Sequence, residues 1–279
     1  MLSETDFLIF SQKGYLECYN IDTVSDLEKE LIDLGNSLRE VVSTQSGSGN
    51  RNIIIGMGAD GTATHNLDRI CDDHILNFIH ERDLPLNLIS EESGFTDFGY
   101  DESLMVDPLD GTYNAENGIP FYSFSGAVVR EDLSSARIAI VADLARNTNY
   151  HAVKGKGAFA NGKRIHVSVD PLGCALGGLG RAGHDHVSPI LRGAWRIRSL
   201  GCASLELCLV ANGSADIMAY VGDYNSLRNI DVAGGVLILR EAGGVVLDGE
   251  FNDFNMGLDV RERKAIIGAS SREFAGALK

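Results

Sequence analysis

The chain has 279 residues, of which 44% are hydrophobic and 23% are charged, and its formal net charge is −15. This composition is typical of a globular protein with a substantial core. The acidic balance and the lack of a basic, aromatic-interleaved patch exclude nucleic acid as a partner, and no apolar run reaches the roughly 18 residues that a membrane helix needs.

The first half of the chain shows helical and strand patterns in alternation. Amphipathic helices are predicted over residues 23–42 and 63–82. Short apolar strands are predicted over residues 52–57, 86–90 and 103–106. The Gly/Ser-rich stretch 43–50 is typical of a loop. Pro108 should end the third strand, because proline lacks the N–H group that a strand ladder uses.

The second half continues with short strands and then mixes them with helices. A meander of strands is expected over residues 121–153, followed by strands at 172–180, 195–199 and 215–220. Helices are expected near residues 186–192, 202–212, 230–242 and 271–277. The pattern predicts an α/β fold in which layers of helices and sheets alternate. A boundary near residue 150 would separate an N-terminal lobe, 1–150, from a C-terminal lobe, 151–279.

Charge differs strongly between the two halves of the sequence. Residues 1–125 carry 6 Lys and Arg against 23 Asp and Glu, a balance of −17, whereas residues 126–279 carry 18 against 16, a balance of +2. An acidic region repels a phosphate ester unless bound cations invert the local field. We therefore expect the first half to bind metal and the second to supply cations for substrate, although most of these acids simply keep the surface soluble.

Two features bear on the cellular compartment. The N-terminal stretch lacks the basic and long apolar regions of a secretory signal. The five cysteines are odd in number and form no Cys-x-x-Cys pair. Both observations predict free thiols in a reducing cytoplasm.

The most informative motif is Asp107-Pro108-Leu109-Asp110-Gly111-Thr112. Two carboxylates and the carbonyl of Leu109 can converge on one cation, and Mg²⁺ prefers such oxygen ligands together with a substrate phosphate. Free N–H groups of Gly111 and Thr112, at the start of a predicted helix, can hold an anion. Asp-Pro and Asp-Gly pairs are also common in plain turns. An EF-hand is excluded, because its acids would lie at positions 1, 3 and 5.

Further carboxylates follow other predicted elements. Glu91 and Glu92 end an apolar strand, where adjacent acids repel each other unless a cation or solvent relieves them. Asp231 lies near a helix start, where a carboxylate can also be a simple cap. Asp60 lies in Gly58-Ala59-Asp60-Gly61-Thr62, which follows the apolar stretch 53–55. A solvated loop and a helix cap remain open alternatives for these acids.

Together these motifs resemble the inositol monophosphatase family. Its members are Mg²⁺-dependent, often lithium-sensitive phosphatases, and they include fructose-1,6-bisphosphatases. The resemblance covers essentially the whole chain and includes the segments 155–162 and 198–203. Ile230 stands where the family usually has tryptophan. With Arg228 and the form of the early motif, this is similar to the archaeal branch that acts on both inositol monophosphate and fructose-1,6-bisphosphate.

The resemblance implies a layered fold, a homodimer, two or three Mg²⁺ per site (Mn²⁺ is a possible substitute) and hydrolysis of a small phosphorylated sugar or cyclitol by metal-activated water. The implied ligands are Glu91, Asp107 and the Leu109 carbonyl for the first ion, Asp107, Asp110 and Asp231 for the second, and Glu92 for a weaker third. Thr112 would pass a proton from the water towards Asp60, with Glu91 as a further catalytic group. The implied substrate contacts are Gly111, Thr112, Gly201, Cys202 and Ala203, with Arg181, Arg198 and Arg228 as candidates for a second anionic group.

Other functions remain open at this point. One is a narrower phosphatase for nucleotides of the 3′-phosphoadenosine 5′-phosphate type, and another is a catalytically inactive phosphate-binding protein. Gly56-x-Gly58-x-x-Gly61 matches a dinucleotide-binding fingerprint, but Asp60 inside the loop would repel a pyrophosphate. The triplet 184–186 (His-Asp-His) is typical of a solvated loop rather than a metal site. Cys202 and Cys208, six apart on a predicted helix, are expected to pack in the core.

Overall fold

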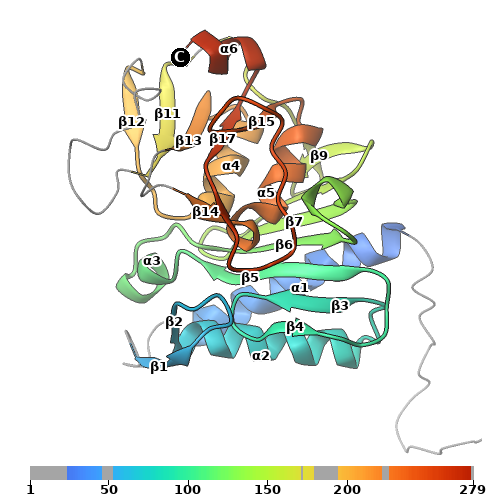
Figure 1. Ribbon diagram of the computed structural model, residues 1–279. Helices are drawn as coiled ribbons and strands as arrows, with labels where there is room; N and C mark the ends of the chain where they lie inside the picture. The colour runs from blue at the N-terminus through green and yellow to red at the C-terminus, as the bar shows by residue number, and fades with distance from the viewer. Residues whose placement is uncertain (1–23, 46–52, 171, 179–193, 222–225, 278–279) are drawn as a thin grey trace, which may run out of the picture.

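The computed structural model describes residues 24–45, 53–170, 172–178, 194–221 and 226–277. These residues form alternating layers, which Figure 1 shows from bottom to top. Helices α1 and α2 cover one face of an eight-stranded sheet, and α4 and α5 lie between that sheet and a second sheet of five strands. Helix α6 packs on the second sheet. The predicted α/β layered fold is confirmed.

The described helices are α1 (Val24–Gln45), α2 (Asn66–Glu81), α3 (Thr112–Asn117), α4 (Ala203–Ala211), α5 (Asn229–Glu241) and α6 (Arg272–Ala277), with a 3₁₀ turn at Leu133–Ser135. None of these helices is long and apolar enough to cross a membrane.

The first sheet has the strand order β10-β9-β8-β7-β6-β5-β3-β4. Its strands are β3 (Asn87–Ser90), β4 (Gly94–Thr96), β5 (Ser103–Asp110), β6 (Ser123–Val129), β7 (Ile138–Asp143), β8 (Thr148–Val153), β9 (Gly157–Ala160) and β10 (Lys163–Ile165). All neighbours are antiparallel except β3 and β5.

The second sheet has the order β12-β11-β13-β17-β15. Its strands are β11 (Cys174–Gly177), β12 (Arg196–Arg198), β13 (Ile217–Tyr220), β15 (Val245–Asp248) and β17 (Ile266–Ala269). Two small antiparallel pairs complete the described structure: β1 (Ile54–Met57) with β2 (Ala63–His65), and β14 (Leu227–Arg228) with β16 (Arg263–Lys264).

Helix α5 is buried almost all round, and two glycines make its position possible. A Cβ on Gly234 would lie 2.7 Å from the carbonyl oxygen of Ile140, and one on Gly235 would lie 2.6 Å from a methyl carbon of Leu207. Any larger residue would therefore push α5 away from the first sheet or from α4. The close packing holds the N-terminus of α5, which carries Asp231, beside the end of β5.

The prediction that a strand ends at Pro108 is wrong, because β5 continues to Asp110. Asp107 pairs with Ser125 and Asp110 with Ser123, so β5 advances three residues while β6 advances two. Pro108 lies in this bulge, and the pairing of β5 with β3 has already ended at Val106. Its missing N–H therefore costs no ladder bond.

Most other predicted elements are confirmed with small shifts. Residues 63–65 form β2 rather than the start of α2, and strands β9, β10, β15 and β17 were not predicted individually. The helix expected near 186–192 and most of the loop at 43–50 lie outside the described residues. The first sheet continues to Ile165 and the second begins at Cys174, so the predicted boundary near residue 150 falls within β8. The division into two functional lobes stays a prediction.

Candidate active site

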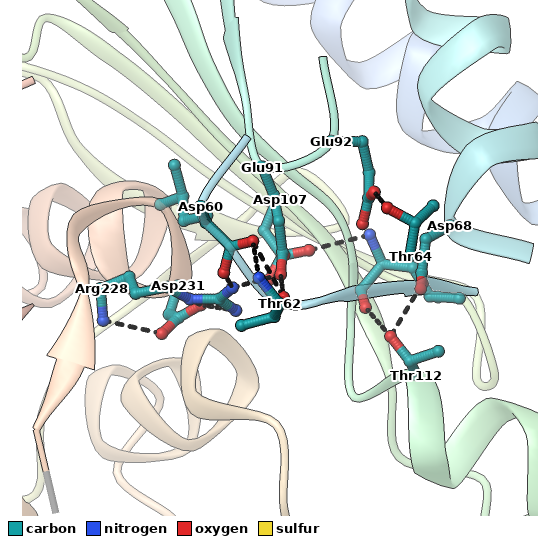
Figure 2. Close-up of polar contacts among 12 residues, drawn as sticks. Asp60, Thr62, Thr64, Asp68, Glu91, Glu92, Asp107, Thr112, Arg228 and Asp231 are labelled. Carbon is teal, nitrogen blue, oxygen red and sulfur yellow. Dashed lines mark hydrogen bonds and ion pairs between the residues drawn. The ribbon is translucent and has the colours of Figure 1, made fainter. Parts of the chain in front are cut away.

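Four separate parts of the chain bring five carboxylates together where β3 and β5 end. Glu91 follows β3, Asp107 and Asp110 lie in the β5 bulge, Asp231 is in the first turn of α5, and Asp60 is in the turn between β1 and β2. Carboxylate oxygens of Glu91, Asp107 and Asp231 all lie within 4.8 Å of one another. Figure 2 shows Asp60 beside this group.

The pKa values of Glu91, Asp107 and Asp110 are raised, because burial and the neighbouring acids outweigh the positive charge nearby. Burial raises the pKa of Glu91 to about 8, against the opposing charge of Arg228. Burial together with the neighbouring acids raises the pKa of Asp107 well above its usual value, and burial next to Asp231 raises the pKa of Asp110 to about 6. A set of converging oxygen donors with this repulsion suits a hard divalent cation, so these residues fit the metal that the sequence implies.

Arg228 is the nearest internal cation to the cluster. Its Nη1 contacts the carboxylates of both Asp60 and Glu91, and its Nη2 and Nε lie 2.7 and 3.0 Å from Asp231 Oδ1. Its backbone N–H also donates to Asp231 Oδ2 at 2.8 Å. The guanidinium thus forms ion pairs with the predicted metal ligands Glu91 and Asp231. Its role in binding a distal phosphate stays a prediction.

Asp110 is anchored differently from the other acids. Its Oδ2 accepts hydrogen bonds from the backbone N–H and the hydroxyl of Ser204, at 2.7 and 2.6 Å, and from the Cys202 thiol at 3.2 Å. This places the predicted substrate segment Gly201–Ala203 directly beside a predicted metal ligand. Cys202 and Cys208 are buried in the hydrophobic core, as predicted, and the Cys202 thiol also contacts Asp110.

The expected proton relay from Thr112 to Asp60 is wrong in its partner. The Thr112 hydroxyl lies 2.8 Å from Asp68 Oδ1 and 3.1 Å from the carbonyl oxygen of Leu109. Figure 2 shows Thr112 and Asp68 joined in this way. Asp60 instead accepts hydrogen bonds from the backbone N–H and hydroxyl of Thr62, at 2.8 and 2.9 Å. Sequence reasoning missed Asp68 because it lies within the apolar pattern of a helix.

The two aspartates also differ in their electrostatics. Burial raises the pKa of Asp68 to about 7 despite the hydrogen bond from Thr112. Burial acts in the same direction on Asp60, but hydrogen bonds from Thr62 and the charge of Arg228 hold the pKa of Asp60 below its usual value. A general base works best with a pKa near the operating pH, so Asp68 suits that role better than Asp60.

Glycine is required where the substrate segment meets the start of α3. Gly111 has φ +91°, and a Cβ there would lie 3.2 Å from the carbonyl oxygens of both Gly201 and Phe121. The Asn114 side chain donates to the carbonyls of Leu200 and Phe121, at 2.7 and 2.8 Å. The predicted phosphate-binding turn and the substrate segment are therefore held in contact.

The remaining predicted residues lie further out. Glu92 is buried and accepts a hydrogen bond from the Thr64 hydroxyl, outside the tight group of three carboxylates. Arg198 is exposed on β12, where its Nη1 donates to the carbonyl of Ile197 at 2.8 Å. Arg181 and the triplet 184–186 lie outside the described residues.

The dinucleotide fingerprint at 56–61 lacks its structural context. The turn is followed by β2 rather than directly by a helix, and its Ala59 N–H donates to the Glu91 carbonyl at 3.0 Å. The turn therefore supports the acidic cluster and does not open a phosphate-binding helix.

Comparisons with known proteins agree with this geometry. Residues 24–279 match the model of the family described as "Inositol monophosphatase family". A fructose-1,6-bisphosphatase/inositol-1-monophosphatase of Methanothermobacter thermautotrophicus is 33% identical over 260 residues, covering 87% of this chain and 91% of that protein. A Pyrococcus horikoshii protein, described as having similarities to inositol-1 monophosphatase, superimposes with a TM-score of 0.80 at 29% identity, covering 92% of this chain and 98% of that one.

A further relative combines two activities in one chain. The bifunctional NADP phosphatase/NAD kinase of Methanococcus maripaludis is 31% identical over 267 residues. The match covers 87% of this chain but 47% of that protein, so this chain spans about half of its length.

Proposed function

The chain belongs to the inositol monophosphatase family, and we propose that it is a Mg²⁺-dependent phosphatase for small phosphorylated sugars or cyclitols. Fructose-1,6-bisphosphate and inositol-1-phosphate are the proposed substrates. The observation that carries this proposal is the group of half-buried Glu91 and buried Asp107 and Asp231, with oxygens within 4.8 Å of one another, next to the hydrogen-bonded Asp68 and Thr112.

The proposed cation ligands are Glu91, Asp107, the carbonyl of Leu109, Asp110 and Asp231, with Glu92 available for a weaker ion. When bound, Mg²⁺ would lower the pKa of a water and neutralise the phosphoryl oxygens. The carboxylates would hold the cation, and Arg228 compensates the excess negative charge among Asp60, Glu91 and Asp231.

The proposed proton path uses Thr112 and Asp68. The attacking water gives a proton to the Thr112 hydroxyl oxygen, and the Thr112 hydroxyl proton moves to Asp68 Oδ1, 2.8 Å away. The water oxygen bonds to phosphorus, the ester P–O bond breaks, and the departing alcohol oxygen takes a proton from solvent. Asp68, with its pKa raised to about 7, is deprotonated in a useful fraction of molecules at neutral pH.

The segment Gly201–Ala203 is proposed to hold the alcohol side of the substrate. Cys202 within it and Ser204 directly after it bind Asp110, and Leu200 directly before it accepts a hydrogen bond from Asn114 of α3. Backbone N–H groups of Gly111 and Thr112 are proposed to hold the phosphate, and exposed Arg198 is a candidate for a second anionic group.

A second candidate function is hydrolysis of a phosphate monoester on a nucleotide. The observation that favours it is the relative whose phosphatase activity is named for NADP. The same metal and proton chemistry would serve a ribose phosphate, whereas a different pocket would be needed for the base. A catalytically inactive protein is less well supported, because Thr112, Asp68 and every proposed metal ligand are present.

A phosphate-release assay with a substrate panel tests the proposal. Purified protein with Mg²⁺ would be given fructose-1,6-bisphosphate, inositol-1-phosphate, NADP and 3′-phosphoadenosine 5′-phosphate, with Asp110→Asn as the matched inactive control. We expect the sugar bisphosphate and the cyclitol phosphate to be hydrolysed fastest. Faster release from NADP would favour the second candidate, and no release from any substrate would refute both. A homodimer and a cytoplasmic location stay predictions.

A further inference from the structure

Two contacts join the N-terminal end of α2 to α3, and only one of them belongs to the proton path. The first is the Thr112–Asp68 hydrogen bond of 2.8 Å. The second joins His65 Nδ1 to Glu116 Oε1 at 2.9 Å. Thr112 and Glu116 are four residues apart on α3 and therefore share a face of that helix. His65 is the residue directly before α2, and Asp68 is the third residue within it.

His65 contacts one residue of each pair. Its imidazole binds Glu116, and its backbone N–H donates to Asp68 Oδ2 at 3.2 Å. The second oxygen of Asp68 accepts from Thr112. The chain of contacts is thus closed: from His65 to Asp68, across to Thr112, along one turn of α3 to Glu116, and back to His65.

Helix α3 needs such external support. It has six residues and is flanked by Gly111 and Gly118, both with positive φ. A helix this short is not stable through its own hydrogen bonds. Asn114 fixes α3 to the substrate segment, and Glu116 fixes it to α2, which carries Asp68.

The buried Glu116 carboxylate is not expected to stabilise the fold. Its side chain is 3% exposed, and among the described residues its Oε2 has no hydrogen-bond partner. A buried polar atom without a partner is costly, and apolar residues of similar size often replace buried ion pairs at no loss of stability. Its geometry therefore points to a role in placing neighbouring groups.

We propose that His65 and Glu116 form a positioning pair that holds Asp68 at hydrogen-bonding distance from Thr112. The proposal deepens the proposed function and rests on it. Neither residue reaches the substrate in this scheme. They act by fixing α2 against α3, so that the proton acceptor keeps its place. Small displacements of catalytic groups cost large factors in rate.

The test compares Glu116→Leu, Glu116→Gln and His65→Ala with the wild type. Leucine removes the acceptor and the unpaired buried oxygen together, and the His65 imidazole, whose side chain is 27% exposed, can then bind water. Glu116→Leu should therefore change the melting temperature little while kcat falls by ~10- to 100-fold. KM should change by less than about twofold, because uniform substrate binding is untouched. Glutamine retains an oxygen that can accept from His65, and Glu116→Gln should recover most of kcat.

Two controls separate positioning from general damage. Glu28→Ala breaks another His–Glu pair, in which Glu28 of α1 contacts His151 of β8 at 2.7 Å; it should lower stability and leave kcat unchanged. The double variant His65→Ala/Glu116→Leu should be no slower than either single variant, because both remove the same link.

The outcomes distinguish this inference from the proposed function. If the wild type is active and both Glu116→Leu and His65→Ala keep the wild-type kcat, the positioning role is refuted and the proposed function stands. A fall in kcat that only follows a fall in melting temperature would also overturn it. A wild type that releases no phosphate from any substrate would overturn the proposed function and the catalytic role of the pair with it.

Discussion

Arg228→Leu should destabilise the protein strongly in chelator and much less in Mg²⁺. The Arg228 side chain is 14% exposed and contacts three carboxylates, those of Asp60, Glu91 and Asp231. Leucine would leave these acids buried and mutually repelling. A bound divalent cation would supply the missing positive charge, so the loss of stability should depend on the metal.

The size of the effect follows from the burial of these groups. Removing one partner of a buried ion pair typically costs about 3–5 kcal/mol in the free energy of unfolding. For a chain of this length, about 2–4 °C of melting temperature correspond to each kcal/mol, so the melting temperature in chelator should fall by roughly 6–20 °C. Saturating Mg²⁺ should recover most of this loss, because the acids without the guanidinium should bind the cation more tightly, and tighter binding stabilises the folded variant more than the wild type.

Thermal unfolding of both proteins, with chelator and across a Mg²⁺ series, measures the effect, and calorimetric titration of Mg²⁺ gives the affinity directly. Arg137→Leu is the matched control: Arg137 forms a two-bond ion pair with Glu102, 2.6 Å for each bond, and it should lose the same stability in both conditions. Equal losses for Arg228→Leu with and without Mg²⁺ would refute the reasoning.

The same variant tests the prediction from sequence that Arg228 binds a distal phosphate. In that case KM for fructose-1,6-bisphosphate alone should rise, by roughly ten- to a hundredfold for a charged hydrogen bond. If Arg228 instead compensates the metal ligands, kcat/KM for the bisphosphate and for inositol-1-phosphate should change by the same factor.

Four further predictions can be checked with the same assay. Asp110→Asn and Asp231→Asn should each lower kcat by on the order of 10³-fold while circular dichroism shows an intact fold, because each removes one ligand charge; near wild-type rates would disprove that ligand. Chelator should abolish phosphate release, and Mg²⁺ or Mn²⁺ should restore it, since all proposed ligands are oxygens. Because the general base must be deprotonated, kcat should rise about tenfold per pH unit below the Asp68 pKa of about 7 and level off above it; a profile unchanged in Asp68→Asn would exclude Asp68 as that base. Lithium should inhibit, weakly given Ile230 beside Asp231, and a dose series without inhibition would refute this prediction.

The layered fold could be predicted from periodicity, because apolar spacing alone separates helices from strands. Residues at 27, 31, 34 and 38 line the buried face of α1, and the meander at 121–153 appears as β6, β7 and β8. The end of β5 could not be predicted in this way. Proline forbids a ladder bond at position 108, but the bulge opposite β6 and the earlier end of β3 remove the need for one.

The candidate metal ligands were visible because most of them are close in sequence. Asp107, Leu109 and Asp110 lie within one short motif, and strand ends deliver Glu91 to the same place. A hydrogen bond between distant segments carries no comparable signal. The carboxylate partner of Thr112 depends on how α2 packs beside α3. That packing brings Asp68 to the Thr112 hydroxyl, while Asp60 is held by Thr62 and Arg228.

The sequence by itself therefore determined the fold class, the family resemblance and the acids available for a metal. These follow from the spacing of apolar residues and from motifs whose residues are close together in the sequence. Only the tertiary structure decided that Asp68 receives the Thr112 hydrogen bond, that Arg228 lies among the carboxylates and that His65 meets Glu116. The physical reason is that these contacts join residues 44, 168 and 51 positions apart. Their distances are set by the packing of helices and sheets, which no local pattern encodes.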